Sequence, residues 1–178
     1  MAPPLILASA SPARRRLLER AGITFTVMPA GIDEDMITDS MRADDASVEA
    51  VVGALAEAKA RKVSARNPES LVIGADQIAE LHGKPIGKPA DKQEARAQLR
   101  ALTGQTHHLS VSVTVAKDGE AIWNHLDSAA MTMRPLSDAA IDRYLERSYD
   151  RAQHSCGCYM IEEDGVRLFR DIQGDFFT

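Results

Sequence analysis

The sequence predicts an α/β or α+β protein built on a mixed β-sheet, and three observations support this prediction. Helical and strand-like patterns alternate along most of the 178 residues. The run LVIGADQIAEL at 71–81 is typical of a strand whose start is buried on both faces. Asp118 and Gly119 form a hairpin-type pair between two further strand patterns. A chain of this length can bury one sizeable core, so we expect a single domain covering residues 1–178.

Hydrophobic periodicity sets the order of the elements, because apolar residues run together or alternate in strands and recur once per turn in helices. The acidic stretch at 31–45 shows neither pattern, and we expect a loop there. The expected strands cover residues 5–8, 24–28, 71–81, 107–116, 121–134 and 166–169. The expected helices cover residues 12–21, 47–64, 91–103 and 137–147.

Local signals place the starts of three helices. Ser11 followed by Pro12 is a strong start signal, because serine caps the first N–H groups and proline suits the first helical position. Asp91 followed by Glu94 resembles a capping box, and Ser137 caps the last expected helix. Each of these helices therefore has a defined beginning in the sequence.

The composition argues against several classes of protein. The net charge is −5 and the basic residues are scattered, which argues against a general nucleic-acid binder. No apolar run approaches the length of a membrane span, and the N-terminus lacks the pattern of a secretion signal. We therefore expect a cytoplasmic protein with no membrane or nucleic-acid partner, in which a local positive pocket holds any anionic ligand.

Two cysteines, Cys156 and Cys158, flank Gly157. This spacing is poor for an ordinary disulfide, and no second pair of Cys or His residues completes a zinc site. We expect reduced, buried thiols.

The most informative stretch is LILASASPARRRLLERAG at 5–22, which reads as a strand, a turn and a helix. Ser9 and Ser11 supply hydroxyls at the turn, and arginines including Arg14 and Arg15 open the helix. A helix N-terminus favours anions, whereas arginines in the first turn are unfavourable unless an anion offsets them. This conflict indicates a bound phosphate, and the alternative is a solvated basic turn.

Asp76 is the second chemical signal, because it lies where a buried strand becomes polar. Ligand groups gather at strand ends in open α/β sheets, so this carboxylate could bind a divalent cation or act as general base for a water. The alternative is an aspartate that only caps a turn. Two lysines can reach an anion: Lys59, which could instead extend to solvent from the apolar side of its helix, and Lys88, which Pro89 restrains.

In order and spacing, these residues resemble one family, the Maf-like nucleoside triphosphate pyrophosphatases. The resemblance covers almost the whole chain and depends on six short motifs taken together. The motifs are LASASPARRRLL at 7–18, Ile32-Asp33-Glu34, LAEAKA at 55–60, Gly74-Ala75-Asp76-Gln77, Gly87-Lys88-Pro89 and LTGQTH at 102–107.

The resemblance implies an enzyme that hydrolyses the α–β phosphoanhydride of a nucleoside triphosphate. It implies an elongated mixed β-sheet flanked by helices, with two lobes around a deep nucleotide-binding cleft, usually in a homodimer. Asp76 would be the catalytic carboxylate, and with Glu34 it would hold Mg²⁺ or Mn²⁺. The residues that would bind the phosphates are Ser9, Ser11, Arg14, Arg15, Lys59 and Lys88.

Base specificity can be compared residue by residue. The dTTP/UTP type carries two adjacent arginines after Ser-Pro, a Thr after the catalytic Asp and a Gln-Gly in a later loop. This chain has Ala13 at the first arginine position, Gln77 after the aspartate and Glu162 in the loop, and it is similar to the 7-methyl-GTP type. A carboxylate such as Glu162 can accept both donors of the guanine edge and complement the charge of the methylated base. Glu163 replaces the glycine that usually follows.

Other possibilities remain open at this point. Family members usually continue with a further strand and a terminal helix that this sequence lacks, which would leave Phe176 and Phe177 exposed. The chain could be a dTTP/UTP pyrophosphatase, or a catalytically weak Maf-like regulator of septum formation or cell division. An inosine-triphosphate-type pyrophosphatase fits less well, because that family's opening motif pairs Thr and Asn with a Lys. Pyrophosphate release from a nucleotide panel separates these possibilities.

Overall fold

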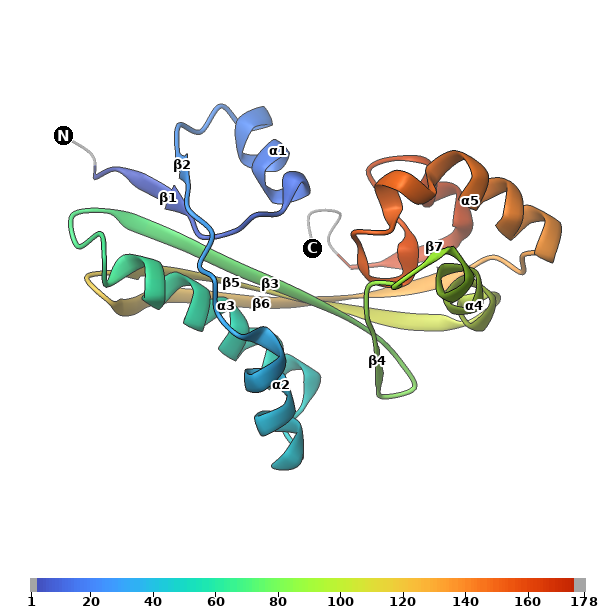
Figure 1. The fold of residues 1–178 in the computed structure, drawn as a ribbon, viewed down its shortest axis with the longest axis horizontal. Helices are drawn as coiled ribbons and strands as arrows, with labels where there is room; N and C mark the ends of the chain where they lie inside the picture. The colour runs from blue at the N-terminus through green and yellow to red at the C-terminus, as the bar shows by residue number, and fades with distance from the viewer. Residues whose placement is uncertain (1–2, 175–178) are drawn as a thin grey trace. The chain divides into compact units, whose positions relative to one another are not determined.

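A computed structural model describes residues 3–174 of the chain, and Figure 1 shows its helices and strands. The strands are β1 (Leu5–Leu7), β2 (Thr26–Val27), β3 (Leu71–Leu81), β4 (Lys84–Ile86), β5 (Thr106–Lys117), β6 (Glu120–Met133) and β7 (Phe169–Gln173). The α-helices are α1 (Pro12–Arg20), α2 (Glu34–Ala43), α3 (Val48–Ser64), α4 (Lys92–Leu102) and α5 (Asp138–Ala152). Two 3₁₀-helices follow α5, namely η1 (Cys156–Cys158) and η2 (Asp164–Leu168).

The strands form one mixed sheet in the order β2-β1-β3-β5-β6-β7, and β4 pairs with β3 beside this path. β1 runs parallel to both β2 and β3, with Leu7 opposite Ile73 in β3. β4 is antiparallel to β3, and β7 is antiparallel to β6. Parallel and antiparallel pairs within one helix-flanked sheet confirm the predicted fold class.

The contacts divide the chain into two compact units, which we describe separately. The first unit comprises the described part of Met1–Gln77 together with Val111–Asp127. The second comprises Ile78–Ser110 together with the described part of Ser128–Thr178. Strands β3, β5 and β6 contribute residues to both units.

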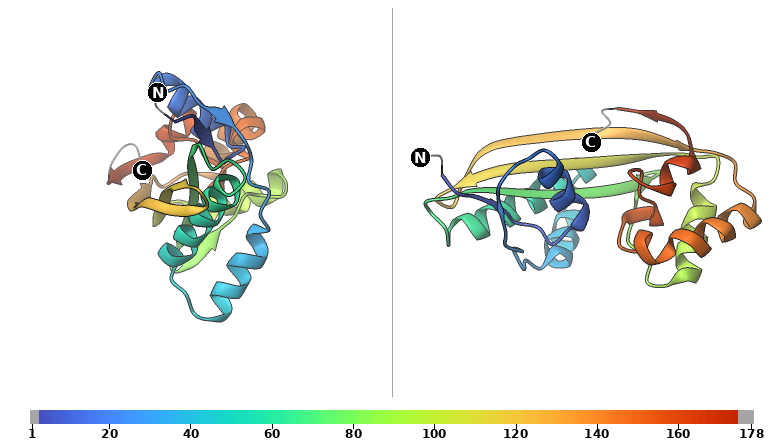
Figure 2. Two further views of the ribbon diagram at one scale, coloured as in Figure 1. Left: turned by 90° about the vertical axis from the view of Figure 1, so that its left-hand side faces the viewer. Right: turned by 90° about the horizontal axis from the view of Figure 1, so that it is seen from above.

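In the first unit, α1 lies on one side of the strands and α2 and α3 lie on the other (Figures 1 and 2). Helix α3 begins after Ser47, whose side chain accepts a hydrogen bond from the backbone N–H of Ala50. A buried apolar cluster joins this helix to β1 and β3, and its members are Ile6, Ala8, Val63 and Val72. The helix is therefore fixed both by its cap and by its packing on the sheet.

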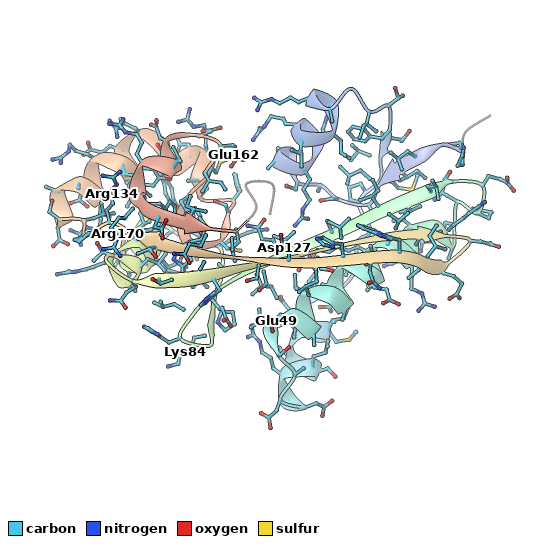
Figure 3. The ribbon with its side chains drawn as sticks, turned by 180° about the vertical axis from the view of Figure 1, so that it is seen from behind. Glu49, Lys84, Asp127, Arg134, Glu162 and Arg170 are labelled. Atoms are coloured by element: carbon cyan, nitrogen blue, oxygen red, sulfur yellow. The ribbon has the colours of Figure 1, made fainter. Side chains whose placement is uncertain are left out.

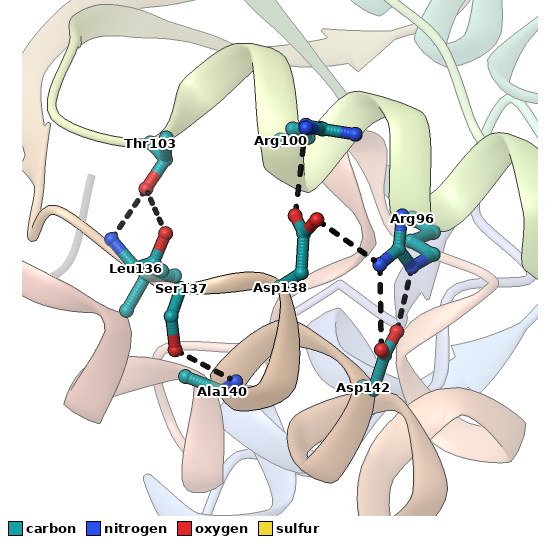
Figure 4. A network of polar contacts seen from close by, with 8 residues as sticks. All are labelled: Arg96, Arg100, Thr103, Leu136, Ser137, Asp138, Ala140 and Asp142. Carbon is teal, nitrogen blue, oxygen red and sulfur yellow. Dashed lines mark hydrogen bonds and ion pairs between the residues drawn. The ribbon is translucent and has the colours of Figure 1, made fainter.

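In the second unit, α4 packs beside α5, and Figure 4 shows the polar network that joins them. The Arg96 guanidinium donates to both carboxylate oxygens of Asp142, at 2.6 and 3.3 Å, and lies 3.6 Å from Asp138. The hydrogen bond from Arg96 holds the pKa of Asp142 below its usual value. The backbone N–H of Leu136 donates to Thr103 Oγ1 at 2.6 Å, which ties the end of α4 to the segment before α5.

A buried histidine lies in the core of the second unit. The ring of His107 is fully buried against Tyr159 and Phe169, and its Nε2 lies 2.7 Å from the Tyr159 hydroxyl. Its Nδ1 has no hydrogen-bond partner among the residues that the structure describes. Burial lowers the pKa of His107 to about 4, and the neighbouring His108 acts in the same direction. The folded protein therefore holds this imidazole in its neutral form.

We expect this histidine to make the protein less stable as the pH falls from about 6.5 to about 4. The unfolded chain takes up a proton at the ordinary pKa, whereas folded His107 does not until its lowered pKa of about 4 is reached. Urea unfolding at pH 7 and pH 4.5 measures the effect. Wild type should lose about 2 kcal/mol more than a His107→Gln variant, which keeps a polar partner for Tyr159. Equal losses would contradict the prediction.

The structure corrects the loop predicted at 31–45, because this stretch contains helix α2. Asp33 caps the helix, and its Oδ1 accepts a hydrogen bond from the backbone N–H of Met36 at 3.0 Å. Glu34 and Asp35 occupy the first turn, where the helix dipole favours acidic residues. The acidic composition that suggested a loop is therefore a helix-start signal.

The structure also corrects the late strand predicted at 166–169, because most of this stretch is the 3₁₀-helix η2 and β7 begins only at Phe169. Helix α5 runs past the predicted end at residue 147 to Ala152, and β4 was not predicted. The prediction about Phe176 and Phe177 lies outside the described residues.

Neither Cys156 nor Cys158 forms a disulfide, and Cys158 is the more buried of the two. Burial raises the pKa of the Cys158 thiol to about 11, so a reactive thiolate is disfavoured there. None of the helices in the described part of the chain is both long enough and apolar enough to cross a membrane.

Candidate active site

The candidate site lies in the first unit and centres on a buried lysine–aspartate pair. Asp76 lies on β3 and Lys59 on α3, and Lys59 Nζ donates to Asp76 Oδ1 at 2.8 Å. The exposed fractions of the two side chains are only 8% for Lys59 and 11% for Asp76. Two buried charges are tolerated when each is paired, so each residue depends on the other. The sequence marks these residues as separate candidates, and the structure brings them together.

Gly74 lets α3 approach β3 closely at this point. Side chains alternate along a strand, so Gly74 and Asp76 face the same side of β3. A Cβ atom at residue 74 would lie 2.6 Å from the backbone N and 2.8 Å from the Cβ of Ala60, and it would also meet the carbonyl oxygen of Ala56. Both alanines belong to α3 and flank Lys59 in sequence. The close packing of glycine on alanine therefore sets the distance between Asp76 and Lys59.

A second carboxylate reaches the same lysine from α2. Glu34 Oε1 lies 2.9 Å from Lys59 Nζ, and the Glu34 side chain is half exposed. Asp33 caps α2, so Glu34 is the first helical residue. Lys62, further along α3, donates to the Gly31 carbonyl at 2.7 Å and holds the loop that precedes Glu34. Sequence reasoning missed Lys62, although its spacing from Lys59 places both lysines on neighbouring parts of one helix face.

The turn after β1 brings Arg14 to Asp76. Ser11 caps α1, and its Oγ accepts from the backbone N–H of Arg14 at 3.4 Å. Ser9 is buried, and its Oγ accepts from the Ser11 N–H and from Arg14 Nη1, both at 3.2 Å. Arg14 Nη2 lies 4.0 Å from Asp76 Oδ1. Ser9 therefore orients a guanidinium at the positive end of a helix, where an anion is favoured.

We call Ser9, Arg14, Glu34, Lys59 and Asp76 the Asp76 cluster. It contains two cations and two carboxylates, and both carboxylates contact one ammonium nitrogen. Mg²⁺ is usually bound by one or two carboxylates, with substrate phosphates and water completing its shell. Within residues 3–174, no group of three or more His, Cys, Asp or Glu side chains could hold a metal by itself. The cluster therefore fits a cation that takes two carboxylates from the protein and its remaining ligands from a phosphate and water.

Arg15, predicted to bind phosphate, lies outside this cluster. Its Nε donates to Glu19 Oε1 at 2.7 Å on the exposed surface of α1, and this hydrogen bond raises the pKa of the guanidinium. Arg15 also borders an open cavity of about 360 Å³ beside α1 and β2. The other residues that line this cavity are Glu19, Ile23, Thr24, Phe25 and Val27.

The remaining predicted residues have different settings. Ala13 lies in the first turn of α1 and Gln77 follows Asp76 on β3, and both are half-buried. Lys88 and Glu162 are exposed and belong to the second unit. Figure 3 labels Glu162, which lies between η1 and η2. The roles of these four residues stay predictions.

Glu163, which stands where the family pattern has glycine, does not need the left-handed backbone that favours glycine, because its φ is −130°. Its carboxylate lies 2.9 Å from Arg151 Nε, so the side chain also gains an ion pair with α5. The structure therefore accommodates a glutamate at this position and pairs it with α5.

The fold is that of an α/β protein with a mixed sheet flanked by helices, and its candidate site combines a helix N-terminus with a buried carboxylate–lysine pair beside the first strands. A family model described as "Maf-like protein" matches residues 4–178. The chain belongs to this family.

Similar proteins carry two kinds of name. A "7-methyl-GTP pyrophosphatase" of Rhizobium etli is 47% identical over 178 residues, which cover 100% of this chain and 89% of the relative. A "Nucleoside triphosphate pyrophosphatase" of Caulobacter vibrioides is 46% identical over 175 residues, which cover 98% of this chain and 87% of the relative. Among solved structures, the lipoprotein GNA1162 from Neisseria meningitidis matches 86% of this chain over 100% of its own length. The identity is 12% and the TM-score is 0.33, so this likeness supports no conclusion about the chain.

Proposed function

We propose that this chain is a nucleoside triphosphate pyrophosphatase that hydrolyses the α–β phosphoanhydride bond, with 7-methyl-GTP as its preferred substrate. The observation that carries the proposal is the buried Lys59–Asp76 pair, which Arg14 and Glu34 approach from two further helices. The names of the relatives at 46 and 47% identity support the reaction, and the Rhizobium etli name supports the base.

The reaction adds a water oxygen to the α-phosphorus and breaks the bond from that phosphorus to the α–β bridging oxygen. The products are a nucleoside monophosphate and pyrophosphate. The triphosphate must be neutralised, the water placed in line, and the charge on the leaving pyrophosphate stabilised. Arg14, oriented by Ser9, and Lys59 are suited to bind phosphate oxygens. Asp76 is the carboxylate that can take the proton of the water or hold a cation, and both roles need its negative charge.

Asp76 and Glu34 would hold a divalent cation, Mg²⁺ or Mn²⁺, because both carboxylates contact the same ammonium nitrogen in the structure. When bound, such a cation supplies positive charge that neutralises the triphosphate and acidifies a coordinated water.

Pyrophosphate release from a nucleotide panel tests the proposal. The panel contains 7-methyl-GTP, GTP, dTTP, UTP and inosine triphosphate, each with Mg²⁺ or Mn²⁺. Release of one pyrophosphate per nucleotide, with 7-methyl-GTP fastest, is the expected result. If the protein released no pyrophosphate from any of these nucleotides, the proposal would be wrong. That result would favour the alternative, a catalytically weak Maf-like regulator.

We expect Arg14→Ala and Lys88→Ala each to lower kcat/KM by about 10- to 100-fold, as for the loss of one charge-assisted hydrogen bond to a phosphate. The matched control is Arg20→Ala, because Arg20 is exposed in the last turn of the same helix as Arg14. This control should retain wild-type kcat/KM. Equal losses in all three variants would mean that only general positive charge matters.

We expect kcat/KM for 7-methyl-GTP to exceed the values for dTTP and UTP by at least about tenfold, the effect of one well-made polar contact. Glu162→Gln should narrow this gap, because the amide replaces an acceptor oxygen with a donor that faces the donors of guanine. Glu163→Gln is the matched control, since the Glu163 carboxylate already pairs with Arg151. A preference for dTTP or UTP, or an equal effect of both substitutions, would show that Glu162 does not select the base.

A further inference from the structure

We infer that Lys59 occupies the cation position between Asp76 and Glu34 in the nucleotide-free protein, and that a divalent cation binds tightly there only when nucleotide phosphates attract the lysine away. The inference rests on the proposed function, because those phosphates belong to the substrate. It assigns to Lys59 a second role besides binding phosphate. The lysine makes tight binding of the cation depend on the presence of the nucleotide.

The geometry gives the ammonium and a metal ion the same place. Lys59 Nζ lies 2.8 Å from Asp76 Oδ1 and 2.9 Å from Glu34 Oε1. An ammonium has three donors, so one lysine can satisfy both carboxylates at once. A divalent cation held by these two carboxylates would need the oxygens that the ammonium now contacts. Ammonium and cation therefore compete for the same ligands.

The charges in the Asp76 cluster also disfavour a divalent cation when no nucleotide is bound. Arg14 Nη2 lies 4.0 Å from Asp76 Oδ1, so two cations already face the buried carboxylate. Glu34 faces Lys59 from the half-exposed side of the cluster. A divalent cation that approaches without nucleotide meets a cluster whose negative charges are already matched, and it must compete with the lysine for the two carboxylates.

A triphosphate changes this balance because it offers the lysine new acceptors. The lysine side chain is a flexible four-carbon stem with a compact charge, so it can turn from carboxylate to phosphate without moving the backbone of α3. The two carboxylates are then left for a cation. Nucleotide and cation should therefore raise each other's affinity by the same factor.

Binding of Mn²⁺ in the absence of nucleotide, followed by electron paramagnetic resonance, tests the inference without any measurement of activity. Lys59→Met and Lys59→Gln should each bind Mn²⁺ at least about tenfold more tightly than wild type, because the competing charge is gone. Lys59→Arg keeps the charge and should bind as weakly as wild type. The matched control Lys117→Met removes an exposed lysine at the end of β5 and should also leave the affinity unchanged. Adding Glu34→Gln to Lys59→Gln should abolish the gain.

Circular dichroism checks that each variant folds, and Lys59→Gln is included because its amide can still donate to the carboxylates. Folded neutral variants that bind Mn²⁺ no better than wild type would overturn the inference, as would an equal gain in Lys117→Met. A second measurement uses wild type alone: a non-hydrolysable α,β-methylene analogue of 7-methyl-GTP should raise the Mn²⁺ affinity of the protein at least tenfold beyond chelation by the free analogue. No rise would overturn the inference even if the neutral variants fail to fold.

Pyrophosphate release by wild type separates this inference from the proposed function. Release of pyrophosphate without tighter Mn²⁺ binding by the neutral variants would support the enzyme and reject the role of Lys59. Tighter Mn²⁺ binding without release from any nucleotide would support the shared position of lysine and cation and reject the proposed reaction.

Discussion

Replacing Asp76 by asparagine is expected to lower turnover by about 10²–10⁴-fold and to leave the fold intact. The asparagine oxygen can still accept the hydrogen bond from Lys59, and Glu34 still pairs with that lysine, so the buried ammonium keeps partners. The substitution removes only the negative charge, which the proposed reaction needs either to hold a cation or to take a proton from water. Initial rates of pyrophosphate release with saturating 7-methyl-GTP and Mn²⁺ measure the loss, and circular dichroism checks the fold.

Asp118→Asn provides the matched control for this experiment. Asp118 is exposed at the turn between β5 and β6, with a φ of 52°, a conformation that asparagine adopts as readily as aspartate. The control removes one carboxylate from the same unit without touching the Asp76 cluster and should retain full turnover. If Asp76→Asn were also fully active, Asp76 would not be the essential carboxylate and the candidate site would lie elsewhere.

The helix starts could be predicted because they depend on local hydrogen bonds. Ser11, Asp91 and Ser137 each accept a hydrogen bond from a backbone N–H three residues further along, as their positions in the sequence predict. The same kind of signal is present at Asp33, before α2, but the acidic composition of that stretch suggested a loop instead. This error also hid how Glu34 is positioned, since its place in the cluster depends on being the first residue of a helix.

The pairing of Lys59 with Asp76 could not be predicted, because the two residues are 17 positions apart and meet only through the packing of α3 on β3. Periodicity shows that Lys59 lies beside apolar residues, but not which strand it faces. The same limit separates Arg14 from Arg15, since consecutive residues of a helix point about 100° apart. Only the position of α1 on the sheet decides that Arg14 faces Asp76. Arg15 pairs within the helix with Glu19, four residues further along.

The alternation along β5 predicts a strand but not how deeply each face is buried. Val111 and Val113 are half-buried, whereas Ser112 and Thr114 on the other face are buried. Small polar residues on the deeper face are satisfied by the neighbouring strand, as Ser112 Oγ shows by donating to the His125 carbonyl. Burial of this kind depends on what covers the sheet, and hydrophobicity alone gives the opposite ranking.

The requirement for glycine at residue 74 can be explained only from the packing of α3 on β3. In the sequence Gly74 is one residue of a Gly-Ala-Asp-Gln motif, and a glycine inside a strand suggests a bulge or a close backbone approach. The structure shows the close approach, with the backbone of α3 where a side chain at residue 74 would lie. The contacting atoms are backbone atoms and a Cβ, which cannot move aside as the end of a flexible side chain could.

We therefore expect Gly74→Ala to lower the free energy of unfolding by about 3 kcal/mol, the upper end of the usual cost of overpacking. The matched control is the same substitution at Gly53, inside α3, where an added Cβ meets nothing within 4 Å. Alanine favours a helix interior, so Gly53→Ala should raise the free energy of unfolding by about 0.5–1 kcal/mol. Urea denaturation of both variants measures these opposite changes in the free energy of unfolding. The folded fraction of Gly74→Ala should also lose turnover, because the added methyl group pushes Lys59 away from Asp76. If Gly74→Ala were as stable and as active as wild type, close contact between α3 and β3 would not be what positions the Lys59–Asp76 pair.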